Sequence, residues 1–131
     1  TLVYGVLNPH TRSFEYTNAG HCPPLLFDPQ GNVRSLSVGG FFMGLMENTE
    51  YRKEVVKLPP GSVLVIYSDG LVDTMDVAGN FFGLERLKKI ISENRTKSAT
   101  ELRDTILHRL DEFRGDAEVF DDMTLVVIKS L

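Results

Sequence analysis

One short apolar segment constrains the fold of this chain more than any other feature. Residues 62–67 read Ser-Val-Leu-Val-Ile-Tyr, which is nearly all apolar and rich in β-branched side chains. Pro59-Pro60-Gly61 stands directly before the segment and stops any regular element that precedes it. A run of this length and composition predicts a strand that is buried on both faces of a sheet.

Short strand-like runs, separated by turn-forming residues, fill the sequence before this segment. The turn formers include Asn8-Pro9 and the stretch Asp28-Pro29-Gln30-Gly31-Asn32, each of which predicts the turn of a hairpin. The predicted strands are Leu2–Leu7, Phe14–Thr17, Leu25–Phe27, Val33–Leu36 and Tyr51–Leu58.

The pattern changes to helix after residue 83. Leu84, Leu87 and Ile91 have helical spacing and predict a helix over residues 83–94. Ser98-Ala99-Thr100-Glu101 fits a capping box, and the apolar stripe behind it predicts a second helix that ends near Arg114-Gly115. Residues 123–129 (Met-Thr-Leu-Val-Val-Ile-Lys) predict a closing strand. This order predicts an α+β fold in which helices pack on an antiparallel sheet.

Composition argues against several classes of function. The 131 residues suit one domain, and the net charge of −4 with scattered basic residues argues against nucleic acid as a partner. Cys22 is the only cysteine, so neither an internal disulfide nor a cysteine zinc site is expected, and a cytoplasmic location is compatible with this. No apolar run is long enough for a membrane segment, and no signal peptide is visible.

Acidic residues stand where two predicted strands end or begin. Asp69 follows the strand 62–67, and Asp121 and Asp122 directly precede the strand 123–129. If the two strands are antiparallel neighbours, Asp69 faces Asp121 or Asp122 at one edge of the sheet. Clustered carboxylates favour a hard divalent cation, because burying them without a counter-charge is costly. The structural alternative is an ordinary Asp-Gly turn and an exposed Asp-Asp loop.

A second polar feature is the segment Asn18–Pro24 (Asn-Ala-Gly-His-Cys-Pro-Pro). Its small residues permit a tight turn, and its two prolines stiffen the exit. His21 in this turn is a candidate metal ligand, proton carrier or substrate contact, with a purely structural role as the alternative. Cys22 is rejected as a nucleophile, because no base partner or anion-binding loop is recognisable around it.

Two other motifs predict structure and no chemistry. Residues 39–45 (Gly-Gly-Phe-Phe-Met-Gly-Leu) lack the Lys-Ser/Thr of a phosphate-binding P-loop, so they predict a mobile or tightly turned loop. Residues 81–84 (Phe-Phe-Gly-Leu) predict a core anchor and the entry to a helix.

Four motifs, in this order, resemble the bacterial SpoIIE/RsbU-like branch of the PPM metal-dependent protein phosphatases. They are Tyr16–Leu26 (Tyr-Thr-Asn-Ala-Gly-His-Cys-Pro-Pro-Leu-Leu), Tyr67–Asp73 (Tyr-Ser-Asp-Gly-Leu-Val-Asp), Phe82–Leu87 (Phe-Gly-Leu-Glu-Arg-Leu) and Asp121–Leu125 (Asp-Asp-Met-Thr-Leu). Each motif is weak alone, but the four together are specific and span essentially the whole chain.

The resemblance implies an antiparallel β-sandwich flanked by helices, with a metal site at one end. It implies two Mn²⁺ or Mg²⁺ ions that bridge a water, which attacks the phosphorus of phosphoserine or phosphothreonine. By motif match, Asp69 and Asp121 are expected to be metal ligands, and Asp122 a ligand or its neighbour. His21 stands where eukaryotic relatives carry an acidic residue, so loop positioning is expected as much as catalysis. Asp73 stands where many relatives have Glu and is assigned no role.

The family's upstream motif, an Asp-rich segment followed by Ser-Gly-His-Gly, is absent from this sequence. We therefore expect residues 1–131 to be the C-terminal portion of a single SpoIIE/RsbU-like phosphatase domain, incomplete at its N-terminal side. Without the upstream acid, the chain is expected to bind metal weakly or not at all and to be inactive. Exposed apolar surface and strand edges are expected to favour dimerisation.

The resemblance also implies partners. The usual substrates in this branch are phosphorylated anti-anti-sigma proteins of the STAS type, and a sensor or receiver domain is often fused to the phosphatase. The alternative function is a non-catalytic regulatory module that binds a phosphoprotein or another partner without turnover. The paired acids Asp121-Asp122, together with Asp69, favour the enzyme.

Overall fold

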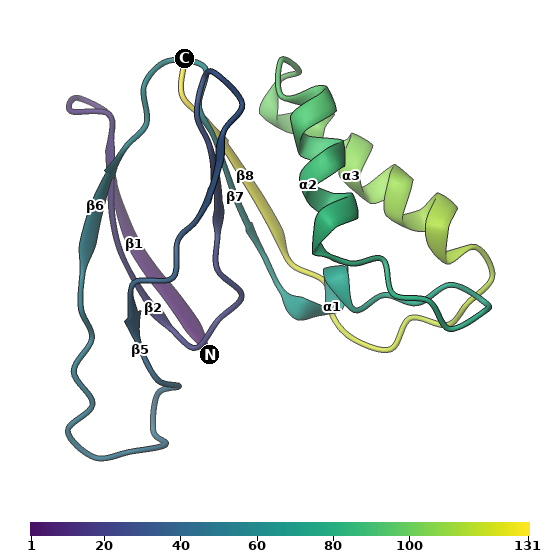
Figure 1. Cartoon of the computed structure of the whole chain (residues 1–131), viewed down its shortest axis with the longest axis horizontal. Coiled ribbons are helices and arrows are strands. Elements are labelled where there is room, and N and C mark those ends of the chain that lie inside the picture. The colour runs from purple at the N-terminus through teal and green to yellow at the C-terminus, as the bar shows by residue number, and fades with distance from the viewer. The chain divides into compact units, whose positions relative to one another are not determined.

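The computed structural model describes all 131 residues, which divide into two compact units. The first unit comprises residues 1–63 with 130–131, and the second comprises residues 64–129. In Figure 1 the first unit is made mainly of strands and the second carries the helices. In chain order the elements are β1 (Leu2–Asn8), β2 (Ser13–Ala19), β3 (Leu25–Phe27), β4 (Val33–Ser35), β5 (Gly39–Gly40), β6 (Glu54–Lys57), β7 (Val63–Tyr67), α1 (Asp69–Val72), α2 (Leu84–Asn94), α3 (Ala99–Arg114) and β8 (Leu125–Lys129).

The first unit is built around β2, which pairs on both sides. β1 and β2 form an antiparallel hairpin whose register runs from Leu2 opposite Ala19 to Asn8 opposite Ser13. β6 pairs antiparallel with β2, and β5 pairs parallel with it over two residues. β3 and β4 form a second antiparallel hairpin around the predicted Asp28–Asn32 turn, in which the Asp28 carboxylate accepts from the Asn32 amide. Both predicted hairpins are confirmed.

The side chains of β2 that face the core are held by packing and by one polar network. The rings of Phe14 and Tyr16 stack with their centroids 5.8 Å apart, and both residues are buried. The Tyr16 hydroxyl donates to Glu54 over 2.7 Å, and Arg34 pairs with the same carboxylate. Burial, reinforced by the bond to Glu54, raises the pKa of Tyr16 to about 12. The ion pair with Arg34 and the Tyr16 bond lower the pKa of Glu54.

The second unit pairs β7 with β8 and packs α2 against α3. Backbone bonds join Ser68 to Thr124 at one end of the strands and Ser62 to Ser130 at the other, so the two strands run antiparallel. The buried helix faces comprise Leu87, Ile90, Ile91, Leu102, Ile106 and Leu110. The predicted capping box is present, because Ser98 accepts from the Glu101 amide and Glu101 accepts from the Ser98 amide.

The α+β fold class is confirmed, and the structure corrects three details of it. The strand pairing is not wholly antiparallel, because β5 runs parallel to β2. Gly39 and Gly40, predicted to lie in a loop, form that strand. Phe81 is 56% exposed and only Phe82 anchors the core. The one-turn helix α1 was not predicted. No helix is both long and apolar enough to cross a membrane.

Candidate metal centre

The segments that carry the three aspartates meet at one end of β7 and β8. Asp69 is the first residue of α1, just beyond β7, and Asp121 and Asp122 lie in the loop before β8. The Ser68 amide donates to the Thr124 carbonyl over 3.1 Å, which ties the two segments together. The prediction that these strands are antiparallel neighbours is therefore confirmed, and it brings Asp69 and the Asp121-Asp122 pair to the same edge.

Two small residues allow the segments to lie in contact. The Ser68 hydroxyl accepts from the Thr124 amide over 2.9 Å and donates to the Asp122 carbonyl over 3.3 Å. At Gly70, a Cβ atom would lie 2.6 Å from the Asp122 carbonyl oxygen and 3.3 Å from the Cβ of Asp121. Only glycine fits at this position without moving the aspartate segment.

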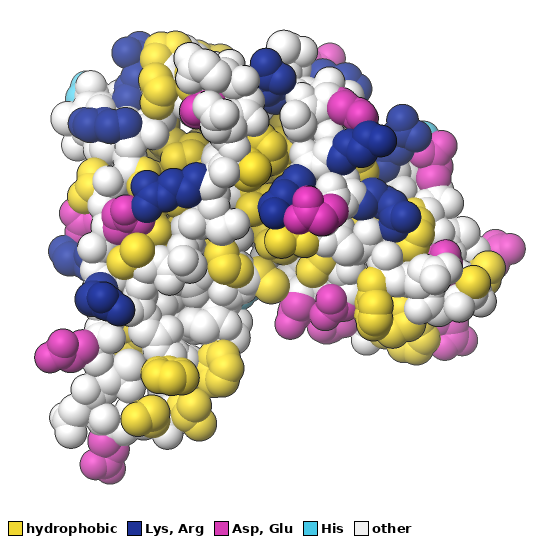
Figure 2. Space-filling view, in the orientation of Figure 1, with side chains coloured by type: hydrophobic (Ala, Val, Ile, Leu, Met, Phe, Trp, Pro, Cys, Tyr) yellow, Lys and Arg dark blue, Asp and Glu magenta, His cyan; other side chains and the backbone are white.

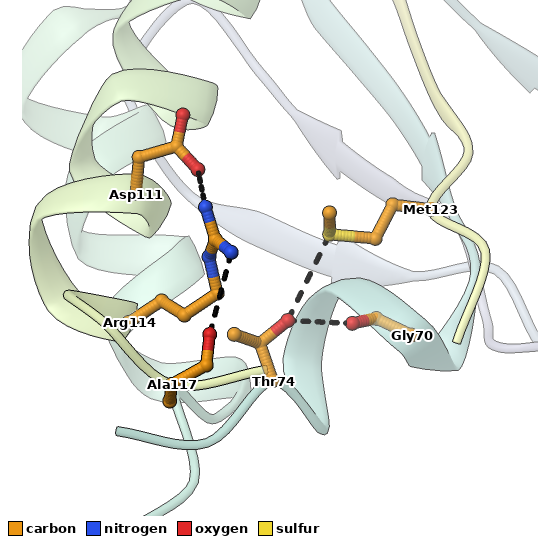
Figure 3. Close-up of polar contacts among 6 residues, drawn as sticks. All are labelled: Gly70, Thr74, Asp111, Arg114, Ala117 and Met123. Carbon is orange, nitrogen blue, oxygen red and sulfur yellow. Dashed lines mark hydrogen bonds and ion pairs between the residues drawn. The ribbon is translucent and has the colours of Figure 1, made fainter. Parts of the chain in front are cut away.

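Further contacts support the same loop from α1 and from the end of α3. Figure 3 shows the Thr74 hydroxyl between the Gly70 carbonyl, 2.7 Å away, and the Met123 sulfur, 3.7 Å away. It also shows Arg114 donating to Asp111 and to the Ala117 carbonyl. The loop that leads to Asp121 is thus fastened close to both of its ends.

The three aspartates are exposed, and their chemistry suits a hard cation. One oxygen of Asp69 accepts from the Gly70 amide and one of Asp121 accepts from the Asp122 amide, while no Lys or Arg forms an ion pair with any of the three. Oxygen-only donors are those that Mg²⁺ and Mn²⁺ prefer. However, no three His, Cys, Asp or Glu side chains gather as a group that could hold a metal. The oxygen donors of these residues suit a divalent cation, but as arranged they do not form a complete metal site.

A pocket of about 240 Å³ opens beside this edge. Its exposed lining surface is mainly apolar, from side chains such as Met75 and Phe120, the latter 75% exposed. Three acidic residues also line the pocket: Asp73, Glu118 and Asp121. The surrounding segments 69–85 and 115–128 contain Asp and Glu but no Lys or Arg. In Figure 2 acidic and hydrophobic side chains lie next to one another at the lower right of the view, where these segments are found. This surface repels phosphate unless a cation offsets its charge.

His21 lies in the first unit, in the turn that follows β2. The buried Asn18 side chain accepts from the His21 amide over 2.8 Å and donates to the His21 carbonyl over 2.9 Å. The His21 ring nitrogen Nδ1 lies 3.1 Å from the Thr1 hydroxyl. The backbone of His21 is therefore held by Asn18, as expected for a residue that shapes a loop, while a catalytic role stays a prediction.

Sequence reasoning missed the residues that arrange the site. Ser68 and Gly70 lie within the motif Tyr67–Asp73 and Thr74 follows it, yet all three make the contacts that hold the aspartate loop. Ser68 and Gly70 directly flank Asp69, which was the available signal.

One further acidic residue was missed. The Asp76 carboxylate accepts from three N–H groups of Ala78 and Asn80, which closes the turn after α1 and lowers the pKa of Asp76. Asp76 therefore shapes this turn through its own hydrogen bonds.

Comparison with known proteins places this geometry in context. The family model described as Stage II sporulation protein E (SpoIIE) matches residues 1–130. The chain is 30% identical over 128 residues to Protein IcfG of Synechocystis and 28% identical over 130 residues to the phosphoserine phosphatase RsbU of Bacillus subtilis. Each match covers 98% of this chain, but only 20% of IcfG and 38% of RsbU.

A solved structure shares the fold. The phosphatase domain of the cell fate determinant SpoIIE from Bacillus subtilis, presoaked with Mn, superimposes with a TM-score of 0.72 at 19% identity. The match covers 99% of this chain and 56% of that one. The chain thus spans about half of the solved domain, and less of the curated relatives, and at this identity the likeness concerns the fold alone.

Proposed function

The chain belongs to the SpoIIE family, and from that premise we propose that it forms part of a metal-dependent phosphatase acting on phosphoserine or phosphothreonine in proteins. The observation that carries the proposal is the meeting of Asp69 with the Asp121-Asp122 segment at one end of β7 and β8. These segments carry carboxylates that pair with no Lys or Arg, and carboxylate oxygens are the donors that a hard divalent cation prefers.

The proposed roles of this chain's residues follow from their positions. Asp69 and Asp121 would hold the cation through their oxygens, and Asp122 would be a further ligand or support Asp121. When bound, two Mn²⁺ or Mg²⁺ ions supply an activated water and neutralise charge on the phosphoryl group. Without a cation, the aspartates and the other acidic residues of segments 69–85 and 115–128 repel a phosphomonoester, so substrate binding depends on the cation.

We propose a phosphoprotein substrate, with a STAS-type anti-anti-sigma factor as the specific candidate. The support is the likeness to RsbU, which is named a phosphoserine phosphatase. The apolar pocket beside Asp121 offers a place for the protein part of such a substrate near the phosphoryl group. A sensor or receiver domain in the same parent protein, and a cytoplasmic location, remain predictions.

We further propose that residues 1–131 alone bind metal weakly and do not turn substrate over. Two Mn²⁺ or Mg²⁺ ions carry four positive charges, and the water molecules that fill their remaining coordination positions offset none of this charge. Three aspartates supply at most three negative charges, and one oxygen of Asp69 and one of Asp121 already accept backbone hydrogen bonds. On this proposal the activity requires a longer protein in which residues 1–131 form the C-terminal portion of the phosphatase domain, and the coverage of 56% of the solved SpoIIE domain supports it.

The second candidate is a regulatory module that binds a phosphoprotein without turnover. The exposed apolar pocket is compatible with it. The arrangement around Gly70 favours the enzyme, because a binding surface needs neither a position without a side chain nor a serine hydroxyl bond to hold the Asp121-Asp122 backbone next to Asp69.

The test is phosphate release from phosphoserine peptides by the longer protein that contains these residues. Release is expected only with Mn²⁺ or Mg²⁺, and Asp69→Asn and Asp121→Asn should each abolish it, while Glu54→Gln, a carboxylate in the first unit, should retain it. Release that needs no divalent cation, or that survives both aspartate substitutions, would exclude the proposal. Peptide binding without release by the longer protein would favour the regulatory module.

A further inference from the structure

We propose that Ser68 is a positioning residue that fixes the Asp121-Asp122 carboxylates relative to Asp69. The inference rests on the proposed function, because it assigns Ser68 to the arrangement of the metal-binding aspartates. Ser68 does not touch the cation itself. Its hydroxyl acts through the backbone of the opposite segment, and the three hydrogen bonds that Ser68 makes to that segment carry the argument.

Ser68 bonds to the aspartate segment through both its backbone and its side chain. Its amide donates to the Thr124 carbonyl over 3.1 Å, and its hydroxyl accepts from the Thr124 amide over 2.9 Å. The hydroxyl also donates to the Asp122 carbonyl over 3.3 Å. A serine or threonine hydroxyl can accept and donate at once, whereas an alanine methyl group does neither. Ser68 therefore holds both Asp122 and Thr124 from the position directly before Asp69.

The Ser68 hydroxyl does not cap α1, although serine at the N-cap of a helix usually does. Ser68 occupies the N-cap of α1 with φ −86° and ψ 162°, but its side chain caps no amide of that helix. An N-cap serine usually accepts from the second or third amide of its own helix. Here α1 is a single turn whose N-terminal amides are partly satisfied in other ways, as by the bond from the Gly70 amide to Asp69. The hydroxyl is thus committed to the strand-to-strand contact and not to the helix.

The residues packed around Ser68 help to fix the backbone that carries Asp121 and Asp122. Gly70 leaves no space between α1 and the Asp122 carbonyl, and Thr74 contacts both Gly70 and Met123. Asp121 and Asp122 are exposed, and their carboxylates bond to no side chain. Their location is consequently set by the backbone of residues 122–124, which Ser68 holds.

A control serine, Ser130, lies directly after β8. The Ser130 hydroxyl donates to the Leu58 carbonyl over 2.7 Å, and Ser130 pairs with Ser62 at the end of the strands away from the aspartates. Ser130→Ala removes one hydroxyl and one hydrogen bond without touching the aspartate segment, whereas Ser68→Ala removes one hydroxyl and two hydrogen bonds. Ser68→Thr keeps the hydroxyl and tests rescue.

The experiment compares the wild-type chain with Ser68→Ala, Ser68→Thr and Ser130→Ala. Three quantities are measured: the hydrogen-exchange rate of the Thr124 amide, the broadening of backbone NMR signals by added Mn²⁺, and the melting temperature. The inference predicts that Ser68→Ala speeds Thr124 exchange and weakens Mn²⁺ binding about ten-fold or more, the size typical of losing a residue that orients a metal ligand. Ser68→Thr should restore both, and Ser130→Ala should leave both unchanged at a similar melting temperature.

The outcomes separate this inference from the proposed function. Mn²⁺ binding in wild type that Ser68→Ala leaves unchanged overturns the inference alone. Equal weakening by Ser130→Ala also overturns it, because the effect would then be general destabilisation. If Mn²⁺ broadens no wild-type signal near Asp69 or Asp121 at the highest concentration at which the protein stays folded, the metal site is overturned, and the inference with it.

Discussion

Replacing Gly70 with alanine should separate the role of the aspartate contact from that of overall stability. The new Cβ would lie 2.6 Å from the Asp122 carbonyl oxygen, whereas ordinary contact begins at 3.4 Å, so the Asp121-Asp122 backbone must retreat by about 0.8 Å. Overpacking of this kind costs about 1–3 kcal/mol. Alanine's preference for helix returns about 0.5–1 kcal/mol. With the middle of each range, the net loss in unfolding free energy is about 1 kcal/mol, which lowers the melting temperature by about 3–6 °C.

A control of similar stability cost is available at Gly79. This residue has φ +82°, and no atom lies within 4 Å of the position that a Cβ would take, so Gly79→Ala strains the backbone without crowding any neighbour. Left-handed backbone costs a non-glycine residue about 1–2 kcal/mol. Thermal unfolding should therefore show similar losses for the two variants. The affinity for Mn²⁺, measured from the broadening of backbone signals, should fall about ten-fold in Gly70→Ala and stay unchanged in Gly79→Ala.

Two results would refute this reasoning. If Gly70→Ala melts at or above the wild-type temperature, the close approach of Gly70 to Asp122 does not exist in solution. If both variants lose Mn²⁺ binding equally, the contact contributes stability only and does not arrange the aspartates.

Three further predictions concern stability and assembly. The ion pair with Arg34 lowers the pKa of Glu54 below its usual 4.5, so this carboxylate stabilises the fold above that pH, and the contribution is lost as pH falls through the lower folded pKa. Glu54→Gln should therefore flatten the acid side of the stability curve measured by thermal unfolding. An unchanged acid slope would contradict this. Ser98→Ala breaks the capping box and should cost about 1 kcal/mol in urea unfolding, with Ser98→Thr restoring most of it; no loss in the alanine variant would be inconsistent with the cap. β1 pairs only with β2 and exposes apolar side chains, so its free edge should associate with a second copy of the chain. Light scattering should show concentration-dependent dimers, and Val6→Lys should suppress them. A wild-type monomer at all concentrations would exclude this association.

The sequence predicted the elements whose signals extend over many residues. The apolar run Val63–Tyr67, the two turn-delimited hairpins and the capped stripe of α3 each involve several side chains that agree with one another. From the order of these elements, and from the position of Asp69 and Asp121 at strand ends, the adjacency of the acids followed as a conditional prediction, and β7 and β8 are indeed neighbours.

The features that escaped prediction depend on contacts between distant residues. β5 consists of two glycines, which are rare in strands. A Cβ at Gly39 would lie 1.8 Å from the Asn18 carbonyl oxygen, so this residue can pair with β2 only because it has no side chain. α1 is one turn long, too short for any periodic signal, and its Asp-Gly start resembles a turn. The clamp made by Ser68 depends on residues 54 and 56 positions away in sequence. No local pattern encodes such a bond.

The most direct test of the metal site is a titration of Mn²⁺ into this chain and into an Asp69→Asn/Asp121→Asn double variant. NMR signal broadening would detect even weak binding, and melting temperatures would show that both proteins are folded. The account predicts weak binding by the wild type, with broadening centred on residues 68–70 and 121–124, and its loss in the double variant. Equal binding by the two folded proteins, or broadening centred elsewhere, would contradict the assignment of Asp69 and Asp121 as metal ligands.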